Sequence, residues 1–447
     1  MSEAAGLPVG EFTGQTAQRI GRGSALGDTR PLLLVVNSGR DATYRGWTLQ
    51  SMSQRYRLWL LSARPAEWEL PYIVGQTFLD VLDGVEAAVA AAERLKEHGP
   101  IAGVVCYDEM RIVAAARLAE RLGLPTATSA AVRSCHDKLL LRRHLGEVRS
   151  LPAADAAEAC AAAARIGYPV IVKPRALAAS EGVVKIDQPD QIEAGFGFAT
   201  NAYANFGALA TDDRGVLVEQ YLDGPEVAVD AVVWRGRVRP AFISHKRQDL
   251  APTFEETGHL VDAEDPLLRD AELLRVVQSA HTAAGFDHGV THTEIRLTPD
   301  GPQLIELNAR LGGDLITHVG LLATGIDLAA AAADVAADIE PDLTPRRRGV
   351  AAVRYLYPAY DLILEQVRIH HHLLPRHTWS VTPLAAPGTP LRRPPASFVK
   401  GRAALGYALA DDVTTCQHAL TELADAVEIT GAPIPAAADP RPSRARR

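Results

Sequence analysis

The chain has 447 residues, of which 47% are hydrophobic and 22% charged, a balance that excludes a largely disordered chain. Because a single hydrophobic core stops growing at roughly 250 to 300 residues, we expect about two to four domains. The net charge of -8 disfavours a nucleic-acid partner and fits a small-molecule substrate.

Targeting and membrane signals are weak in this sequence. Residues 1–14 lack the apolar core of a signal peptide, so we expect a cytoplasmic protein. The Ala/Leu-rich stretch 321–339 is interrupted by Asp327, Asp334 and Asp338, which predicts a helix packed inside a soluble domain, with no contact to a membrane. The four cysteines form no CxxC pair, so neither a disulfide framework nor a thiolate metal site is indicated.

Alternating strand and helix patterns predict that residues 31–127 form an α/β domain. Buried strands are expected at Leu32–Val36 and Ile101–Cys106, with a helix at Ala87–Glu97 between them. A second amphipathic helix follows the second strand, and a glycine and a proline end it. Such alternation is typical of a parallel sheet that helices cover on both faces.

The rest of the chain divides into two further parts. Residues 128–335 change to strands with turn residues between them after an initial helix, which predicts an α+β domain. Residues 346–435 predict a smaller α+β region, a small sheet with helices that packs on the middle domain. The ends, 1–30 and 436–447, are rich in Gly, Ala, Pro, Ser and Arg, and we expect them to be flexible.

Two strand-like segments, 290–297 and 303–308, are joined by a short loop that contains a Pro-Asp-Gly sequence. This pattern predicts a β-hairpin. If Asp300 is the centre of the loop, Thr298 pairs with Pro302, and the rest of the register follows from that pair.

This register brings two carboxylates together. Glu294 would lie opposite Glu306 and His292 opposite Asn308, with all four side chains on one face because side chains alternate with period two. Opposed carboxylates repel each other, so a cation is needed between them. Mg²⁺ binds through one or two carboxylates together with nucleotide phosphates, and the amide oxygen of Asn308 would complete such a site. The alternative is a solvated strand face on which both acids point into water.

The segment after Asn308 favours the magnesium–nucleotide interpretation. Gly312 and Gly313 precede a helical pattern, where exposed backbone N–H groups and the helix dipole favour an anion. Arg310 adds a cation beside them.

Two further segments carry charged residues on apolar strands. Lys173 ends such a strand and precedes a small-residue loop, which favours a phosphate site; the alternative is a lysine that reaches solvent at a sheet edge. Strand 216–219 breaks into an extended link before the chain resumes a strand, and such a hinge supplies backbone amides and an apolar slot for a purine. In the alternative interpretation, Glu219 and Glu226 are ordinary surface acids.

In chain order, these motifs resemble the motif series of the ATP-grasp superfamily. The series comprises Asp137–Lys138, Tyr168–Pro174, Ser180–Gly182, Glu219–Leu222, Glu226, Glu294 and Glu306–Arg310. The similarity is strong over residues 100–325 and weaker in the flanking regions. Within the superfamily, Phe254–His259 and Asn308–Asp314 are similar to bacterial L-amino-acid ligases of the alanine–anticapsin ligase type and to their relatives in peptide-antibiotic pathways.

The resemblance implies a three-part ATP-grasp architecture of α/β and α+β parts, with a mobile lid lobe at about 167–225, and it assigns roles to the motifs. The residues implied to bind ATP are Lys138, Lys173, Ser180, Gly182, Glu219, Gln220, Tyr221, Leu222 and Glu226. Those implied to bind Mg²⁺, with Mn²⁺ as an alternative, are Glu294, Glu306 and Asn308. The implied catalytic residues are Arg310, Lys173 and Lys138, and the implied substrate contacts are Glu256, His259, Arg310 and Gly313.

One segment departs from the family pattern. Ser244–Arg247 carries more positive charge than a small neutral amino acid requires, which leaves the substrate side chain open.

The resemblance implies an ATP-dependent ligase that joins a small-molecule carboxylate to an amine through an acyl-phosphate and releases ADP and phosphate. Three alternatives stay open: transfer of the acyl group to a carrier-protein thiol, a nucleotide-binding module without chemistry, and a biotin-dependent carboxylase component. A homodimer is common among such relatives, but the sequence identifies no interface.

Overall fold

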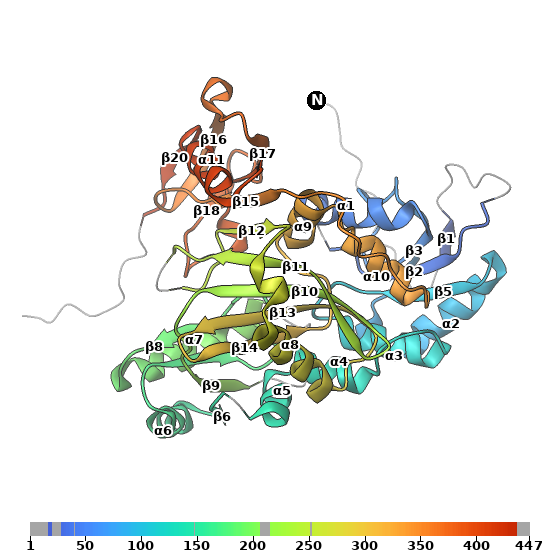
Figure 1. Ribbon diagram of the computed structural model, residues 1–447, viewed down its shortest axis with the longest axis horizontal. Coiled ribbons are helices and arrows are strands. Elements are labelled where there is room, and N and C mark those ends of the chain that lie inside the picture. Colours follow the sequence, from blue (N-terminus) through green and yellow to red (C-terminus); the bar gives the residue numbers. More distant parts are fainter. Residues whose placement is uncertain are drawn as a thin grey trace, which may run out of the picture.

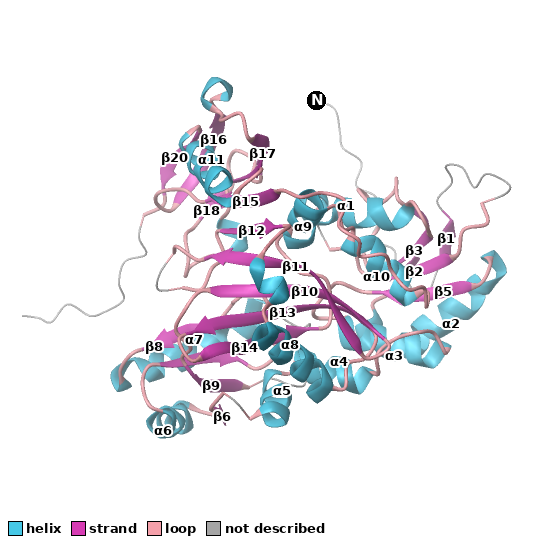
Figure 2. Ribbon diagram, in the orientation of Figure 1, coloured by secondary structure: helices cyan, strands magenta, loops and turns pink. Residues whose placement is uncertain are grey.

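The computed structural model of the protein describes residues 17–19, 28–39, 41–146, 148–205, 215–250 and 253–435. The strands among these residues form four sheets, and helices cover them (Figures 1 and 2). The combination of a parallel α/β domain with antiparallel sheets confirms the predicted fold class.

The N-terminal domain is built on a five-stranded sheet. In spatial order its strands are β1 (Ala17–Arg19), β4 (Ile73–Phe78), β3 (Arg57–Ser62), β2 (Leu32–Val36) and β5 (Ile101–Val105). Strands β2 to β5 are parallel, as predicted, and β1 is antiparallel to β4. The sequence pattern predicted β2 and β5 but not β3, β4 and helix α1 (Ala42–Ser53).

Alternate residues of β2 point into two different cores, which explains its uninterrupted apolar sequence. Leu32 and Leu34 pack with helices α2 (Val85–Leu95) and α3 (Ile112–Leu122). Leu33 and Val35 face the other way, into a core that includes α1 and helix α10 (Leu328–Ala336). Because α10 comes from much later in the chain, this second core joins the N-terminal domain to the rest of the molecule (Figure 1).

Replacing Gly103 of β5 by alanine should destabilise this junction. A Cβ at Gly103 would lie 2.1 Å from the backbone oxygen of Ala336 at the end of α10, so the helix would have to move. We expect Gly103→Ala to lower the free energy of unfolding by about 1–3 kcal/mol, the usual cost of overpacking. The control is Gly46→Ala in α1, where an added Cβ meets no atom within 4 Å and should stabilise the helix by about 0.5–1 kcal/mol. Urea unfolding of both variants is the measurement, and an unchanged midpoint for Gly103→Ala would contradict this packing.

A four-stranded antiparallel sheet forms a separate lobe with its own apolar core. Its strands in spatial order are β6 (Ser150–Ala153), β9 (Val216–Gln220), β7 (Val170–Pro174) and β8 (Val184–Ile186). Helices α6 (Ala156–Ile166) and α7 (Ile192–Ala202) pack on it. The lobe therefore begins at β6, earlier than the lid that the sequence predicted at 167–225.

The largest sheet has eight antiparallel strands and runs through the middle of the molecule (Figure 2). Their spatial order is β14 (Gly301–Asn308), β13 (Gly289–Thr298), β10 (Glu226–Trp234), β11 (Arg237–Arg247), β12 (Gly258–Asp262), β15 (Val350–Leu356), β19 (Ala404–Ala410) and β17 (Thr378–Pro383). One face packs against α4 (Ser129–His136), α5 (Lys138–Leu145) and α8 (Ala271–Ala284). The other face packs partly against α9 (Ile316–Thr324) and α10, and the rest of it carries the charged residues described below.

The C-terminal region is not a separate sheet, in contrast to the prediction for 346–435. Its strands β15, β17 and β19 extend the eight-stranded sheet, and helix α11 (Val413–Asp425) covers them. Only β16 (Leu362–Ile369), β18 (Pro390–Leu391) and β20 (Val427–Pro433) form a small sheet of their own.

The stretch predicted as one packed helix, 321–339, belongs to two. Helix α9 ends at Thr324, Gly325 adopts a left-handed φ of 74°, and Asp327 caps the start of α10. Among the residues that the structure describes, no single helix is long and apolar enough to cross a membrane; α9 and α10 pass that test only as a pair bent by 107°.

Part of the predicted flexible N-terminal end is ordered, because Ala17–Arg19 pair with Thr77, Gln76 and Gly75 of β4. Residues 28–30 are also described, whereas the remainder of 1–30 and all of 436–447 lie outside the described residues.

Candidate functional site

In the β13–β14 hairpin the predicted cross-strand residue pairs are present, but the residues that close the loop differ from the prediction. Glu294 lies opposite Glu306 and His292 opposite Asn308, which confirms the expected pairs. Thr298, however, pairs with Gly301 and not with Pro302. The difference of one residue is cancelled further along, where Ile305 is an extra residue on β14 and forms a β-bulge.

Arg142 of α5 fixes this bulge. Its guanidinium donates hydrogen bonds to the carbonyl oxygens of Leu304 (2.9 Å) and Ile305 (2.7 Å) and forms an ion pair with Glu219 (2.9 Å). Arg142 therefore joins the hairpin of the large sheet to strand β9 of the lobe.

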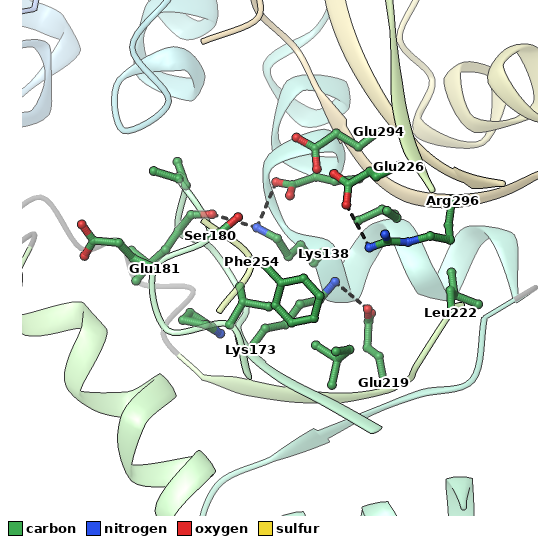
Figure 3. Close-up of a pocket in the computed structure, with 18 of the residues that line it drawn as sticks. Lys138, Lys173, Ser180, Glu181, Glu219, Leu222, Glu226, Phe254, Glu294 and Arg296 are labelled. Atoms are coloured by element: carbon green, nitrogen blue, oxygen red, sulfur yellow. Dashed lines mark hydrogen bonds and ion pairs between the residues drawn. The ribbon is translucent and has the colours of Figure 1, made fainter. Parts of the chain in front are cut away.

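A cavity lies between the lobe and the large sheet (Figure 3). Its lining includes the predicted residues Lys138, Lys173, Ser180, Glu219, Gln220, Tyr221, Leu222, Glu226, Glu256, Glu294, Glu306, Asn308 and Arg310. Gly182 is absent from this lining, although its neighbours Glu181 and Val183 belong to it. The structure thus brings most of the predicted nucleotide and metal residues to one place.

Both predicted phosphate lysines are buried and paired with acids. Lys173 Nζ lies 2.5 Å from Glu219, and Lys138 Nζ lies 2.9 Å from Glu306 while it donates a hydrogen bond to the backbone oxygen of Leu177 (2.8 Å). Burial would raise the pKa of Glu219, but Arg142 and Lys173 outweigh it and hold that pKa below its usual range. Because the Glu219 side chain is engaged in this way, a purine at the hinge would depend on the backbone of the link that follows.

The small-residue loop after β7 has a constrained backbone. Ala179 and Ser180 adopt φ values of 60° and 53°, and Gly182 adopts 77°. Left-handed backbone costs non-glycine residues roughly 1–2 kcal/mol, so surrounding structure must impose it here. A Cβ at Gly182 would lie 2.7 Å from Cβ of Ala202, which shows that this position also needs glycine for close packing.

Lys246 is the centre of the charged face, and it was not among the predicted site residues. Its ammonium lies 2.8 Å from Glu226, 2.7 Å from Glu256 and 2.9 Å from Glu294, and its side chain is 1% exposed. Three carboxylates from three segments of the large sheet region thus share one cation. Burial would lower the pKa of Lys246, but the three glutamates raise it well above its usual value.

The positive charge of Ser244–Arg247 is compensated within the protein. His245 pairs with Asp265 (2.5 Å), Lys246 with its three glutamates, and Arg247 with Asp249 (2.6 Å). This segment therefore gives no argument for an acidic substrate.

The chemistry of the hairpin face fits a divalent cation. Glu294 and Glu306 oppose each other and Asn308 lies on the same face, so two carboxylates and an amide oxygen line the cavity together. Each carboxylate is neutralised by a lysine, Glu306 by Lys138 and Glu294 by Lys246, which is the positive charge that opposed acids require. Oxygen ligands of this kind suit Mg²⁺ when nucleotide phosphates supply the remaining positions.

His292 lies on the same face, beside Glu294. Its ring lies 3.1 Å from Asp230 and 3.5 Å from Glu294. Burial would lower the pKa of His292, but Asp230 and Glu294 raise it to about 9, so the ring is a cation at neutral pH.

A second cavity, of ≈350 Å³, adjoins the first. Three of the four predicted substrate residues line it, namely Glu256, Arg310 and Gly313. The fourth, His259, lies outside its lining. His259 is 2% exposed, with Nε2 3.3 Å from Glu256, and burial lowers its pKa to about 3. His259 therefore lies behind the lining, next to Glu256 and Asp314, which do line the cavity.

Two further charged groups, one in the lining of this cavity and one that contacts the lining, had no local sequence signal. Glu109, from the loop after β5, pairs with Arg310 and lies 2.8 Å from His136. Arg402, 1% exposed, pairs with Glu255 (2.9 Å) and Asp314 (2.6 Å) and stacks on Tyr355. These partners are separated by up to 201 residues in the chain, so only the fold brings them together.

Comparison with known proteins identifies the class. An ATP-grasp domain model matches residues 166–318, and an ATP-grasp N-terminal domain model matches residues 60–126. The L-amino acid ligase of Bacillus licheniformis has a crystal structure that superimposes with a TM-score of 0.75 at 20% identity and covers 90% of this chain and 98% of that one. The chain therefore has the ATP-grasp fold.

Two curated relatives are more similar in sequence. Carnosine synthase 1 of Gallus gallus is 31% identical over 283 residues, which are 58% of this chain and 30% of that protein. Alanine–anticapsin ligase of Bacillus subtilis (strain 168) is 27% identical over 330 residues, 64% of this chain and 68% of that protein. This chain thus spans about a third of the carnosine synthase, and the resemblance to ATP-grasp ligases inferred from the motifs is confirmed.

Proposed function

We propose that this protein is an ATP-dependent carboxylate–amine ligase that forms an amide bond between amino acids, or between an amino-acid-like acid and an amine. The observation that carries the proposal is the junction of the two cavities. Arg310, Glu294, Glu256 and the loop residues Ala178 to Ser180 line both of them. A nucleotide in the first cavity would place its γ-phosphate where a carboxylate in the second could reach it.

The first cavity suits a nucleotide at both of its ends. The hinge end is apolar, with Ile171, Leu222, Phe254 and Ile305 in the lining, and a purine needs such a slot. The junction end carries Lys138 and Arg310, which would bind phosphates. Glu226, held by Arg296 (2.9 Å), would accept hydrogen bonds from the ribose hydroxyls.

The proposed reaction has two steps. A substrate carboxylate oxygen attacks the γ-phosphorus, and the bond from that phosphorus to the β–γ bridging oxygen breaks, which gives an acyl-phosphate and ADP. An amine nitrogen then attacks the acyl carbon, loses a proton and expels phosphate. Mg²⁺ on Glu294, Glu306 and Asn308 would neutralise phosphate charge, while Lys138, Lys173 and Arg310 hold the transferring group in line.

An acyl-phosphate is hydrolysed if water reaches it, so the site must be covered. The lobe built on β6 to β9 contributes the loop Ala178 to Ser180 to both cavities, which supports a covering role for this lobe. Closure of such lobes commonly accompanies nucleotide binding.

The direct test is ADP release from Mg-ATP by the purified protein over single amino acids and amino-acid pairs, with phosphate release and product masses followed in parallel. We expect ADP, phosphate and a new amide from at least one pair. ADP release that requires a carrier protein, with a thioester as product, would favour acyl transfer to a thiol. ATP binding without ADP from any mixture would contradict the ligase proposal and favour a binding module.

A further inference from the structure

Arg45 of α1 lines the second cavity and has no acidic partner. No hydrogen bond or ion pair joins its side chain to another residue that the structure describes, and its guanidinium lies 5.1 Å from the ring centre of Tyr107. The two neighbouring arginines are different, because Arg310 pairs with Glu109 and Arg402 pairs with Glu255 and Asp314. Among the described residues that line this cavity, Arg45 is therefore a cation with no acidic side chain paired to it.

An unpaired guanidinium in a half-buried position is costly. Burial lowers the pKa of Arg45, and the positive charge of Arg310 acts in the same direction. The hydroxyl of the supporting Tyr107 is also buried without a hydrogen-bond partner among the described residues. These two polar groups lack partners and lie beside a cavity, so a ligand in the cavity can supply the missing anion.

The position of Arg45 indicates which anion this is. Arg310 lies where the two cavities meet, whereas Arg45 lines the second cavity and not the first. A nucleotide phosphate at the junction is thus the partner of Arg310. The partner of Arg45 belongs to a molecule held in the second cavity.

The rest of that cavity's lining carries more acids than bases: Asp108, Glu109, Glu255, Glu256, Glu294 and Asp314 against Arg310 and His292. These carboxylates suit an amino group, and Arg45 suits a carboxylate, so the cavity as a whole is complementary to a zwitterion. Its volume of ≈350 Å³ is sufficient for molecules of amino-acid size.

We propose that Arg45 is a specificity residue that binds a second substrate carboxylate, one that is not phosphorylated. This inference rests on the proposed ligase function and defines its substrates as carrying that extra acid group. A guanidinium binds a carboxylate through two parallel hydrogen bonds, and the ring of Tyr107 keeps the guanidinium in place. The carboxylate is either the α-carboxylate of the amine-bearing amino acid or a side-chain carboxylate of a dicarboxylic acid.

The test is calorimetric binding of amino acids to the whole protein with Mg²⁺ and a non-hydrolysable ATP analogue. Each ligand is compared with its matched amide: α-carboxylate against α-amide, and Glu or Asp against Gln or Asn. We expect the acid of one series to bind about 10- to 100-fold more tightly than its amide, as loss of a charge-assisted hydrogen bond predicts. Arg45→Gln should abolish that preference and Arg45→Lys should keep part of it, while Arg348→Gln, at an exposed surface position, should change nothing.

The outcomes separate the inference from the proposed function. Failure of the nucleotide analogue to bind contradicts the ligase proposal. Normal nucleotide binding, with an acid-over-amide preference that Arg45→Gln retains or with no preference in the unaltered protein, overturns the role of Arg45. Thermal unfolding of each variant identifies a folding defect, and the acid–amide comparison in the unaltered protein is independent of any substitution. The series that shows the Arg45-dependent preference identifies the source of the carboxylate.

Discussion

Arg310→Ala is expected to lower kcat by about 100- to 1000-fold, the usual loss when one preorganised donor to a developing negative charge is removed. Arg310 lies at the junction of the two cavities, where the γ-phosphate would meet the substrate carboxylate. Its guanidinium is fixed by Glu109 and by a hydrogen bond to the backbone oxygen of Leu311 (3.0 Å), so it is preorganised before substrates arrive. The affinity for ATP should change little, because the hinge end of the nucleotide cavity is untouched.

Arg296→Ala is the matched control for this prediction. Arg296 lines the same nucleotide cavity but contacts Glu226 and the carbonyl oxygen of Gly224, and it does not line the second cavity. We expect it to raise KM for ATP and to leave kcat nearly unchanged, the reverse of Arg310→Ala. Steady-state kinetics and calorimetric ATP binding separate the two patterns. Parallel loss of ATP affinity and turnover in Arg310→Ala would contradict a role in phosphoryl transfer.

The hairpin shows how far the sequence could predict the site. Period-two alternation predicted that Glu294, Glu306, His292 and Asn308 share a face, and the structure has these pairs. The counting from the loop was nevertheless wrong by one residue, and the bulge at Ile305 corrects it. A bulge of this kind depends on the distant Arg142, which binds the bulged carbonyl groups, so the hairpin sequence alone does not specify it.

The charged network could not be predicted from local patterns. Lys246 occupies one position on β11 among apolar and charged neighbours, and its three glutamates come from β10, β13 and the link before β12. Only the antiparallel order of these strands makes them neighbours. The same holds for Arg45 and Tyr107, which meet because the ends of α1 and β5 lie at one edge of the N-terminal sheet. Two strands with continuous apolar runs, β2 and β5, were recognised, whereas β3, which also has such a run, and the partners across domains were not.

Lys246→Met is expected to destabilise the protein by about 3–5 kcal/mol at neutral pH, the cost of breaking a buried ion pair from one side. Methionine keeps the length of the side chain but removes the charge, which leaves Glu226, Glu256 and Glu294 close together without their shared cation. Lys96→Met is the control, because Lys96 is about half exposed and pairs with the equally exposed Glu93, so it should cost less than about 1 kcal/mol. Urea unfolding measures both.

The pH dependence of Lys246→Met distinguishes lost charge from lost packing. In the unaltered protein, Lys246 and His292 outweigh burial and hold the pKa of Glu294 well below 4.5, so this group stabilises the fold above its unfolded pKa and loses that contribution as pH falls. Burial already raises the pKa of Glu256 in the unaltered protein, although Lys246 opposes it. Without Lys246 we expect the pKa values of Glu256 and Glu294 to rise, so that the folded state binds more protons than the unfolded state. The variant should therefore gain stability relative to the unaltered protein between pH 7.5 and about 5.5. Parallel pH profiles of the unfolding free energy would mean that the defect is one of packing, and the electrostatic role of Lys246 would be refuted.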